Sequence, residues 1–288
     1  MSNLKDIRRR IGGVYKIEQI TRALKLVSAV KLRRAQQMLV DARPYSYRMR
    51  ELMSRMAGLT DRSLHPLLDV HEAVNKVGFL VISSDQGLCG YFNQNIIRKT
   101  EEIISQYTAD QVNLLLVGRK SEAYFFRKEY QIMGEYVALF RQLKFSHAVN
   151  IGNLLKTTYI KKKLDRIYVV YNEFKSAARQ EVVAEQLLPI IPAISESNDW
   201  MPDFILEPNA TAILDYLCPQ NINIQLWRIL LESHAAEMGA RMTSMENATE
   251  NAENLIIELT HDYNKLRQEG ITDEILEIVS GSEALKYI

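Results

Sequence analysis

Apolar residues in the C-terminal third of the chain follow a long helical stripe. They recur in alternating steps of four and three at Met238, Met242, Met245, Thr249, Ala252, Ile256, Leu259, Tyr263 and Leu266. This spacing is the heptad pattern of a helix that packs one side against another helix. The interleaved positions are polar, so only one stripe needs cover. The pattern predicts a helix from about residue 211 to residue 285, roughly 110 Å long at about 1.5 Å per residue.

A second helical stripe begins at the other end of the chain. Apolar residues recur at Leu4, Ile7, Ile11, Val14, Ile20, Leu24 and Val27 and, after a slip in phase, at Ala35, Met38, Ala42, Tyr45, Met49, Leu52, Met56 and Leu59. This pattern predicts a helix about 80 Å long. Because an interior proline removes a hydrogen bond, Pro44 predicts a kink or a short break.

The two helices have complementary charge. The N-terminal helix is rich in lysine and arginine, whereas the middle of the C-terminal helix is acidic. An exposed ion pair between helices adds only about 0.2–0.5 kcal/mol, so charge selects the partner while the apolar stripes hold it. The pattern therefore predicts an antiparallel coiled coil of residues 1–60 with residues 208–288. Residues such as Ile271, Ile275 and Ile278 then form an apolar overhang, because the C-terminal helix is the longer one.

Between the two helices the periodicity changes. Short apolar runs at residues 77–83, 112–118 and 166–172 are typical of buried strands, and residues 181–188 add a further edge strand. Helical stretches at 93–107, 121–129 and 146–163 alternate with them. Alternation of this kind predicts an α/β fold with a mostly parallel sheet. The fold class is thus α/β, with a Rossmann-like domain over 77–207 inserted into the long coiled coil.

Composition excludes some classes of protein. Of the 288 residues, 47% are hydrophobic and 25% are charged, and the net charge is +1, as in an ordinary globular chain. Cys89 and Cys218 form no ligand pattern, which favours a reduced, cytosolic chain. No apolar run approaches the length of about 18 residues that a membrane span needs. The N-terminus enters the helical pattern without an apolar signal segment, so no cleaved presequence is expected.

Few features of the sequence indicate catalysis or ligand binding. Gly87 and Gly90 follow the first strand without the spacing of a dinucleotide or triphosphate loop, which leaves either a structural turn or an anion site at a helix N-terminus. The five histidines lack metal-ligand spacing, and a surface position is expected for His234 and His261. No catalytic residue, metal or cofactor is predicted.

Two other classes of protein stay open on the residues alone. A basic coiled-coil nucleic-acid binder would lose affinity steeply with salt, and a small α/β enzyme would bind nucleotide or turn over substrate.

Three motifs together resemble one family. They are ITRALKLVSAVKLRRA at residues 20–35, SSDQGLCG at 83–90, and YNKLRQEGITDEILEIVSG at 263–281. All three are similar to motifs of the gamma subunits of F-type ATP synthases, in the family's order and over essentially the full length. Gln86 departs from this pattern, where the family usually has Arg or Lys, and so does Tyr91, where a second Gly is common.

The resemblance implies a non-catalytic rotor shaft. The expected partners are three alpha and three beta subunits, the epsilon subunit and the membrane c-ring, with no nucleic acid and no cofactor. Ion flow through the c-ring turns the shaft, and rotation drives the beta subunits through the states that make ATP. The expected location is peripheral, on the cytoplasmic face of the bacterial inner membrane.

The resemblance also assigns contact residues. Arg267 and Gln268 match positions that contact a catch loop of beta, and Thr272 and Glu274 continue that surface. Ile275 begins the apolar tip that is expected to seat in a bearing at the top of the ring. The other expected contacts are those of the N-terminal helix with the lower lobes of beta, at Leu24 and Lys25, and those of a foot on the c-ring and epsilon, at Phe204 and Glu207.

Overall fold

The computed structural model describes residues 4–59, 61–71, 73–191, 207 and 209–286. Its longest elements are the helices α1 (Leu4–Leu59) and α5 (Ala210–Lys286). The chain forms two compact units. The coiled-coil unit comprises Met1–Val27 and Met242–Ile288, and the sheet unit comprises Ser28–Arg241. Each unit contains a segment of α1 and a segment of α5.

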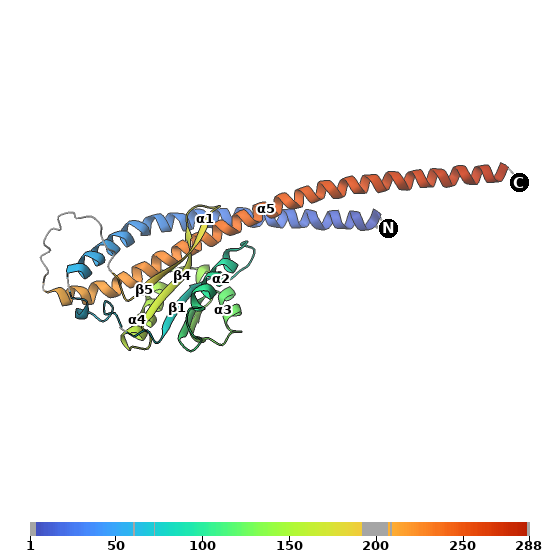
Figure 1. Ribbon diagram of the computed structural model, residues 1–288. Coiled ribbons are helices and arrows are strands. Elements are labelled where there is room, and N and C mark those ends of the chain that lie inside the picture. The colour runs from blue at the N-terminus through green and yellow to red at the C-terminus, as the bar shows by residue number, and fades with distance from the viewer. Residues whose placement is uncertain (1–3, 60, 72, 192–206, 208, 287–288) are drawn as a thin grey trace. The chain divides into compact units, whose positions relative to one another are not determined.

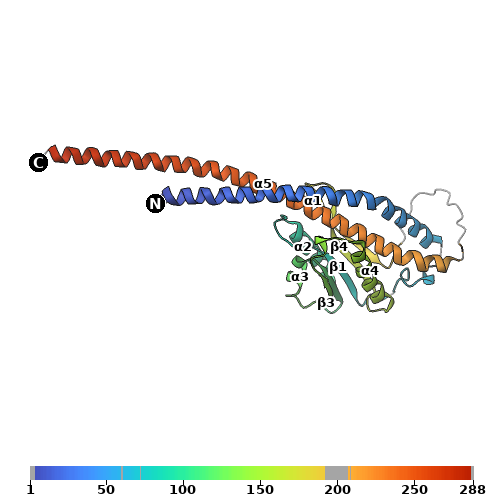
Figure 2. The same ribbon diagram turned by 180° about the vertical axis from the view of Figure 1, so that it is seen from behind.

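In the coiled-coil unit, α1 and α5 run antiparallel (Figures 1 and 2). Val14 packs in one apolar cluster with Ala252, Ile256 and Leu259 of α5. Exposed ion pairs flank this cluster, with Arg22 Nη2 at 2.6 Å from Glu253 Oε1 and Lys25 Nζ at 2.7 Å from Glu246 Oε1. The predicted charge complementarity is therefore confirmed. The predicted α5 stripe is confirmed as well, since its positions from Met242 to Leu266 are all buried or half-buried.

The α1 stripe has a different phase from the predicted one. Ile20 and Val27, expected to face α5, are 58% and 51% exposed, and Met38 and Tyr45 are exposed as well. The buried or half-buried positions instead keep one unbroken alternation of four and three: Ile7, Ile11, Val14, Glu18, Thr21, Lys25, Ser28, Leu32, Ala35, Leu39, Ala42, Ser46, Met49, Met53 and Met56. No slip occurs. Polar residues occupy four successive positions of this stripe, and neighbouring apolar residues on the solvent side concealed its phase.

A polar layer marks the register of the coiled-coil unit. The hydroxyl of Thr249 lies 2.8 Å from the hydroxyl of Thr21 across the two helices, and both side chains are buried. Each threonine is also within hydrogen-bond distance of a backbone carbonyl of its own helix, Glu18 O and Met245 O. Because both hydroxyls have partners, their burial carries little penalty. A shift of either helix would separate them, so this layer favours a single alignment.

The sheet unit holds a five-stranded sheet in the order β3-β2-β1-β4-β5. The four parallel strands are β1 (Val77–Ile82), β2 (Val112–Val117), β3 (Gln131–Tyr136) and β4 (Arg166–Phe174). The edge strand β5 (Gln180–Leu188) pairs antiparallel with β4. The predicted mostly parallel sheet and its edge strand are confirmed. The strand β3 was missed because its sequence QIMGEY lacks a continuous apolar run and its residues are exposed or half-buried.

Helices cover both faces of the sheet (Figures 1 and 2). One face carries α2 (Phe92–Ile104) and α3 (Arg119–Phe125), which follow β1 and β2 in the chain. The other face carries α4 (Phe145–Ile160), which connects β3 to β4, together with the α1 and α5 segments of this unit. Right-handed crossovers explain this division, because the strand order reverses direction between β1 and β4. Two short 3₁₀ turns, Arg62–Leu64 and Leu139–Arg141, lie in the connections.

The α5 segment of the sheet unit is the central helix of its core. Nearly every residue from Asn221 to Met238 is buried, on all sides of the helix. A helix buried all round is expected to be apolar, yet this one carries charged residues. Each such charge has a partner. The carboxylate of Glu232 accepts hydrogen bonds from Arg43 of α1 at 2.9–3.1 Å and from the backbone N–H of Phe174 at 3.0 Å. Glu232 therefore joins α5 to both α1 and β4.

A second buried charge joins α5 to the sheet edge. Arg228 is only 5% exposed, and its guanidinium donates to Glu185 Oε1 of β5 at 2.5 Å and to the hydroxyl of Tyr171 of β4 at 3.1 Å. Burial raises the pKa of Tyr171 to about 12, so the phenol stays neutral and accepts this bond. Removing one partner of such a network would leave an unpaired buried charge, which costs about 3–5 kcal/mol.

The proline in α1 does not interrupt the helix. The structure places Pro44 inside the continuous helix Leu4–Leu59, so the break that its sequence allowed does not form. Burial of the same side of α1 before and after the proline, at Leu39, Ser46 and Met49, explains why the helix continues. The hydroxyl of Ser46 also donates to the carbonyl of Arg43 next to the proline.

The observed register predicts a specific cross-link. In a Thr21→Cys/Thr249→Cys variant we expect a disulfide after mild oxidation, because the native hydroxyls lie 2.8 Å apart. Non-reducing gel mobility and the loss of two free thiols would report it. The matched control is Ile20→Cys/Thr249→Cys, in which the first position is exposed. Equal or faster cross-linking of the control would contradict a register in which Thr21 faces Thr249.

Candidate functional site

The C-terminal end of α5 forms an exposed surface in the coiled-coil unit. The C-terminal end of α5 extends past the N-terminal end of α1 (Figures 1 and 2), and beyond Leu266 nearly every described residue is exposed. The predicted overhang is confirmed, since Ile271, Ile275 and Ile278 are 49%, 55% and 72% exposed. A contiguous apolar helix face left in solvent is typical of a surface that binds another protein.

The residues that the resemblance assigned to this end largely share one side of α5. At about 100° per residue, Arg267, Gln268, Glu274 and Ile275 fall on one face together with the exposed isoleucines, whereas Thr272 lies at its border. All five are exposed. The face thus combines charged, amide and apolar groups, which suits recognition of a partner surface with both polar and apolar parts. Their role as contacts stays a prediction.

The other assigned residues are placed differently. Leu24 is half-buried beside the stripe of α1, and the ammonium of Lys25 is engaged by Glu246. Glu207 is exposed. Phe204 lies outside the described residues.

The glycine-containing loop after β1 is a turn whose backbone polar groups form hydrogen bonds within the protein. The side chain of Asn93 accepts from the backbone N–H of Ser84 at 2.9 Å, and Arg241 of α5 donates to the carbonyl oxygens of Gln86 and Gly87. Gly90 adopts a positive φ of 56°, as a tight turn requires. These contacts favour the structural turn over an anion site at the start of α2.

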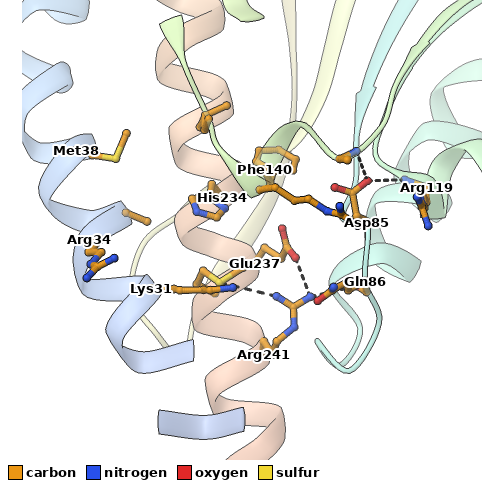
Figure 3. Close-up of a pocket in the computed structure, with 15 residues that line it drawn as sticks. Lys31, Arg34, Met38, Asp85, Gln86, Arg119, Phe140, His234, Glu237 and Arg241 are labelled. Carbon is orange, nitrogen blue, oxygen red and sulfur yellow. Dashed lines mark hydrogen bonds and ion pairs between the residues drawn. The ribbon is translucent and has the colours of Figure 1, made fainter. Parts of the chain in front are cut away.

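A cavity adjoins this loop within the sheet unit (Figure 3). It has a volume of about 330 Å³ and lies at the carboxyl ends of three parallel strands. The connections after β1, β2 and β3 supply Asp85, Gln86, Arg119, Ala138, Phe140, Arg141 and Leu143, and α1 and α5 supply Lys31, Arg34, Ala35, Met38, His234, Glu237, Met238 and Arg241. Sequence reasoning missed this site because its walls come from five separate parts of the chain.

Tight packing of the loops shapes the cavity. Gly118 directly follows β2 at a φ of 89°, and a Cβ there would lie 2.3 Å from the carbonyl oxygen of Ser83, so only glycine fits. The carboxylate of Asp85 accepts from the backbone N–H groups of Arg119, at 3.3 Å, and Ala138, at 2.9 Å. Asp85 therefore fastens the three connections to one another.

His234 contradicts its predicted surface position. Its ring stacks on Phe140 with centroids 5.4 Å apart, and its Nδ1 is buried without a hydrogen-bond partner among the described residues. Burial lowers the pKa of His234 to about 4, with a further contribution from the positive charges of Lys31 and Arg241. The imidazole is therefore neutral at pH 7. His261, by contrast, is exposed as predicted.

The described residues contain neither a metal-ligand cluster nor a membrane-spanning helix. Among them, no three or more His, Cys, Asp and Glu side chains are grouped so that they could hold a metal ion. None of the helices in that part of the chain combines the length and the apolar character that a membrane-spanning segment needs.

The burial of His234 predicts a pH-dependent stability. The unfolded chain takes up a proton near pH 6.5, whereas the folded imidazole resists it down to about pH 4, so the fold loses stability as the pH falls between these values. The loss is on the order of 3 kcal/mol. Asp85, Glu237, Lys31 and Arg241 also face this region. They are the same in the wild type and in a variant of His234, so a comparison of the two proteins isolates the histidine.

In a His234→Phe variant, we expect the free energy of unfolding by urea to fall less between pH 7 and pH 4.5 than in the wild type. The matched control is His261→Phe, which replaces an exposed histidine on the same helix and should follow the wild-type curve. Parallel curves for His234→Phe and the wild type would show that this imidazole is not held neutral by the fold.

Comparison with known proteins shows the family. A family model described as ATP synthase matches residues 3–285. The ATP synthase gamma chain of Chlorobaculum parvum is 42% identical over 291 residues, covering 99% of this chain and 100% of the relative. That of Chlorobium phaeobacteroides is 43% identical, with the same coverage.

Solved structures share the fold. A chain from the mitochondrial ATP synthase of Euglena gracilis superposes with a TM-score of 0.70 at 20% identity, covering 98% of this chain and 94% of the other. A rotor chain of the same enzyme gives a TM-score of 0.65, also at 20% identity, with coverage of 93% and 98%. The family model, the relatives above 40% identity and the shared fold lead to one conclusion: this chain belongs to the ATP synthase gamma chain family.

Proposed function

We propose that this chain is the rotating central shaft of an ATP synthase, which couples ion flow through a membrane c-ring to ATP synthesis in the beta subunits. The observation that carries the proposal is the free end of α5, in a chain of the gamma family. From Arg267 onward the helix has no partner among the described residues, yet it presents apolar side chains to solvent. A surrounding subunit ring would cover them.

The shaft acts by differential contact. Three chemically identical catalytic sites can differ only if the shaft touches each of them differently. The exposed face with Arg267, Gln268 and Ile275 occupies one side of α5, so it would meet one beta subunit at a time. The opposite side, with Glu269 and Asp273, is acidic. Rotation would then present each beta subunit with these two surfaces in turn.

The proposed partners are three alpha and three beta subunits around α5, with epsilon and the c-ring at the foot that includes Phe204 and Glu207. In this proposal, catalysis belongs to the beta subunits. The complex would be peripheral to the membrane, on the cytoplasmic face of the inner membrane of a bacterium. The bacterial gamma chains that this chain resembles support that location.

The test is ATP hydrolysis by the cognate alpha and beta subunits, assembled with and without this chain. We expect the full chain to give a stable, active complex. Truncation after Leu266 removes the free end of α5 and should lower activity or assembly strongly. Arg267→Ala should lower the hydrolysis rate more modestly, because it removes a single charged contact, for which about 1–3 kcal/mol is typical.

Lys265→Ala serves as the matched control, since it removes an exposed positive charge two residues away on another side of α5. It should keep the activity of the full chain. If hydrolysis and assembly do not depend on the chain, or if Lys265→Ala and Arg267→Ala are impaired equally, the proposed shaft or its proposed contact face is wrong.

A further inference from the structure

We propose that the cavity of the sheet unit binds a small phosphate-bearing anion. The position of the cavity is the first observation that supports this proposal. In open α/β sheets, ligands bind in the crevice outside the carboxyl ends of the strands, where the strand order reverses. Here the order reverses between β1 and β4, and the connection after β1 supplies Asp85 and Gln86 to the cavity.

The walls of the cavity are predominantly cationic. Five cationic side chains line the cavity, against two carboxylates. Both carboxylates are already engaged, because Asp85 accepts two backbone N–H groups and Glu237 accepts from Arg241 at 2.7 Å. The cations Lys31, Arg34, Arg119 and Arg141 have no side-chain partner in the hydrogen bonds and ion pairs of the described residues. The cavity therefore holds an excess of unneutralised positive charge.

These cations come from separate elements around the cavity. Lys31 and Arg34 belong to α1, whereas Arg119 and Arg141 follow β2 and β3 at the sheet edge, and all four side chains are exposed. Figure 3 shows Lys31 reaching from α1 toward Glu237 and Arg241 on α5. Its ammonium lies close enough to influence His234 and Glu237 electrostatically. Like charges gathered from separate elements repel one another unless an anion lies among them.

The half-buried imidazole of His234 supplies a neutral donor. His234 Nδ1 has no hydrogen-bond partner among the described residues, and the ring is held against Phe140. A neutral imidazole carries one N–H, so the tautomer with the proton on Nδ1 can donate to a phosphate oxygen. Such a bond would satisfy an atom that is otherwise left unpaired, which gives the site a polar contact in addition to its charge.

The volume limits the ligand. At about 330 Å³ the cavity is near the lower end of the range of ligand pockets, which is roughly 300–1,000 Å³. It suits pyrophosphate or the phosphates of a mononucleotide, and it is too small to enclose a dinucleotide. Arginine side chains recognise phosphate by paired N–H donors, and lysine acts as a point charge.

The experiment is isothermal titration of the full chain with sodium pyrophosphate and with ADP, at constant ionic strength in chloride. We expect both probes to bind with one site per chain. Lys31→Gln/Arg34→Gln should weaken both by about tenfold or more, since charge-assisted bonds are lost on one wall. Arg141→Gln, which acts from the opposite wall, should weaken both as well. Circular dichroism confirms that each variant is folded.

The matched control is Arg98→Gln, which removes an exposed arginine of α2 that does not line the cavity. It should bind both probes like the wild type. The absence of binding by either probe overturns the proposal. Equal weakening by Arg98→Gln would mean adventitious ion binding only, and binding of ADP without pyrophosphate would mean that the nucleoside is recognised; both results overturn the proposal too. The isolated chain suffices, so the outcome is independent of the proposed rotor function.

Discussion

The structure depends on one constraint, which is that a single helix of 77 residues must satisfy three different surroundings. In the sheet unit α5 is buried on nearly all sides, in the coiled-coil unit one stripe is buried, and beyond Leu266 it is exposed. Its side chains change accordingly, from the apolar run around Leu226 to the heptad stripe at Ile256 and then to the exposed isoleucines. Regular helix geometry is kept throughout, so the sequence alone adapts the helix to each environment.

Buried charges are the means by which the sheet unit fixes its helices. Apolar contacts are non-directional and tolerate sliding, whereas a buried carboxylate requires its partners at defined positions. Glu232 holds α1 and β4 to α5, and Arg228 holds β4 and β5. In the coiled-coil unit the Thr21–Thr249 layer restricts alignment in a similar way. A shaft of the kind proposed would need helices that do not slide, and these contacts would resist sliding.

The proposed anion site follows from the same architecture. The loop after β1 is tied down by Asp85 and Arg241, and the glycine at 118 lets two connections approach closely. These features gather the carboxyl ends of three strands beside two helices and leave cationic side chains around a cavity. An anion bound there would link α1, α5 and the sheet. Its binding would therefore stabilise the sheet unit by mass action as well as by local contacts.

The sequence by itself determined the elements and their class. Heptad spacing identified α5 and its free end, short apolar runs identified three of the five strands, residues 181–188 were predicted as the edge strand, and three motifs identified the family. Local periodicity contains this information because burial of one face imposes it residue by residue. The strand β3 escaped, since a half-exposed edge strand carries no such pattern. Tertiary structure alone decided the phase of the α1 stripe. Glu18, Thr21, Lys25 and Ser28 form the stripe in the stretch where apolar spacing had predicted Ile20, Leu24 and Val27. It also decided the burial of His234 and the cavity beside it. Those properties arise from residues far apart in the chain, and only their packing brings Lys31, Asp85, Arg141 and His234 into one place.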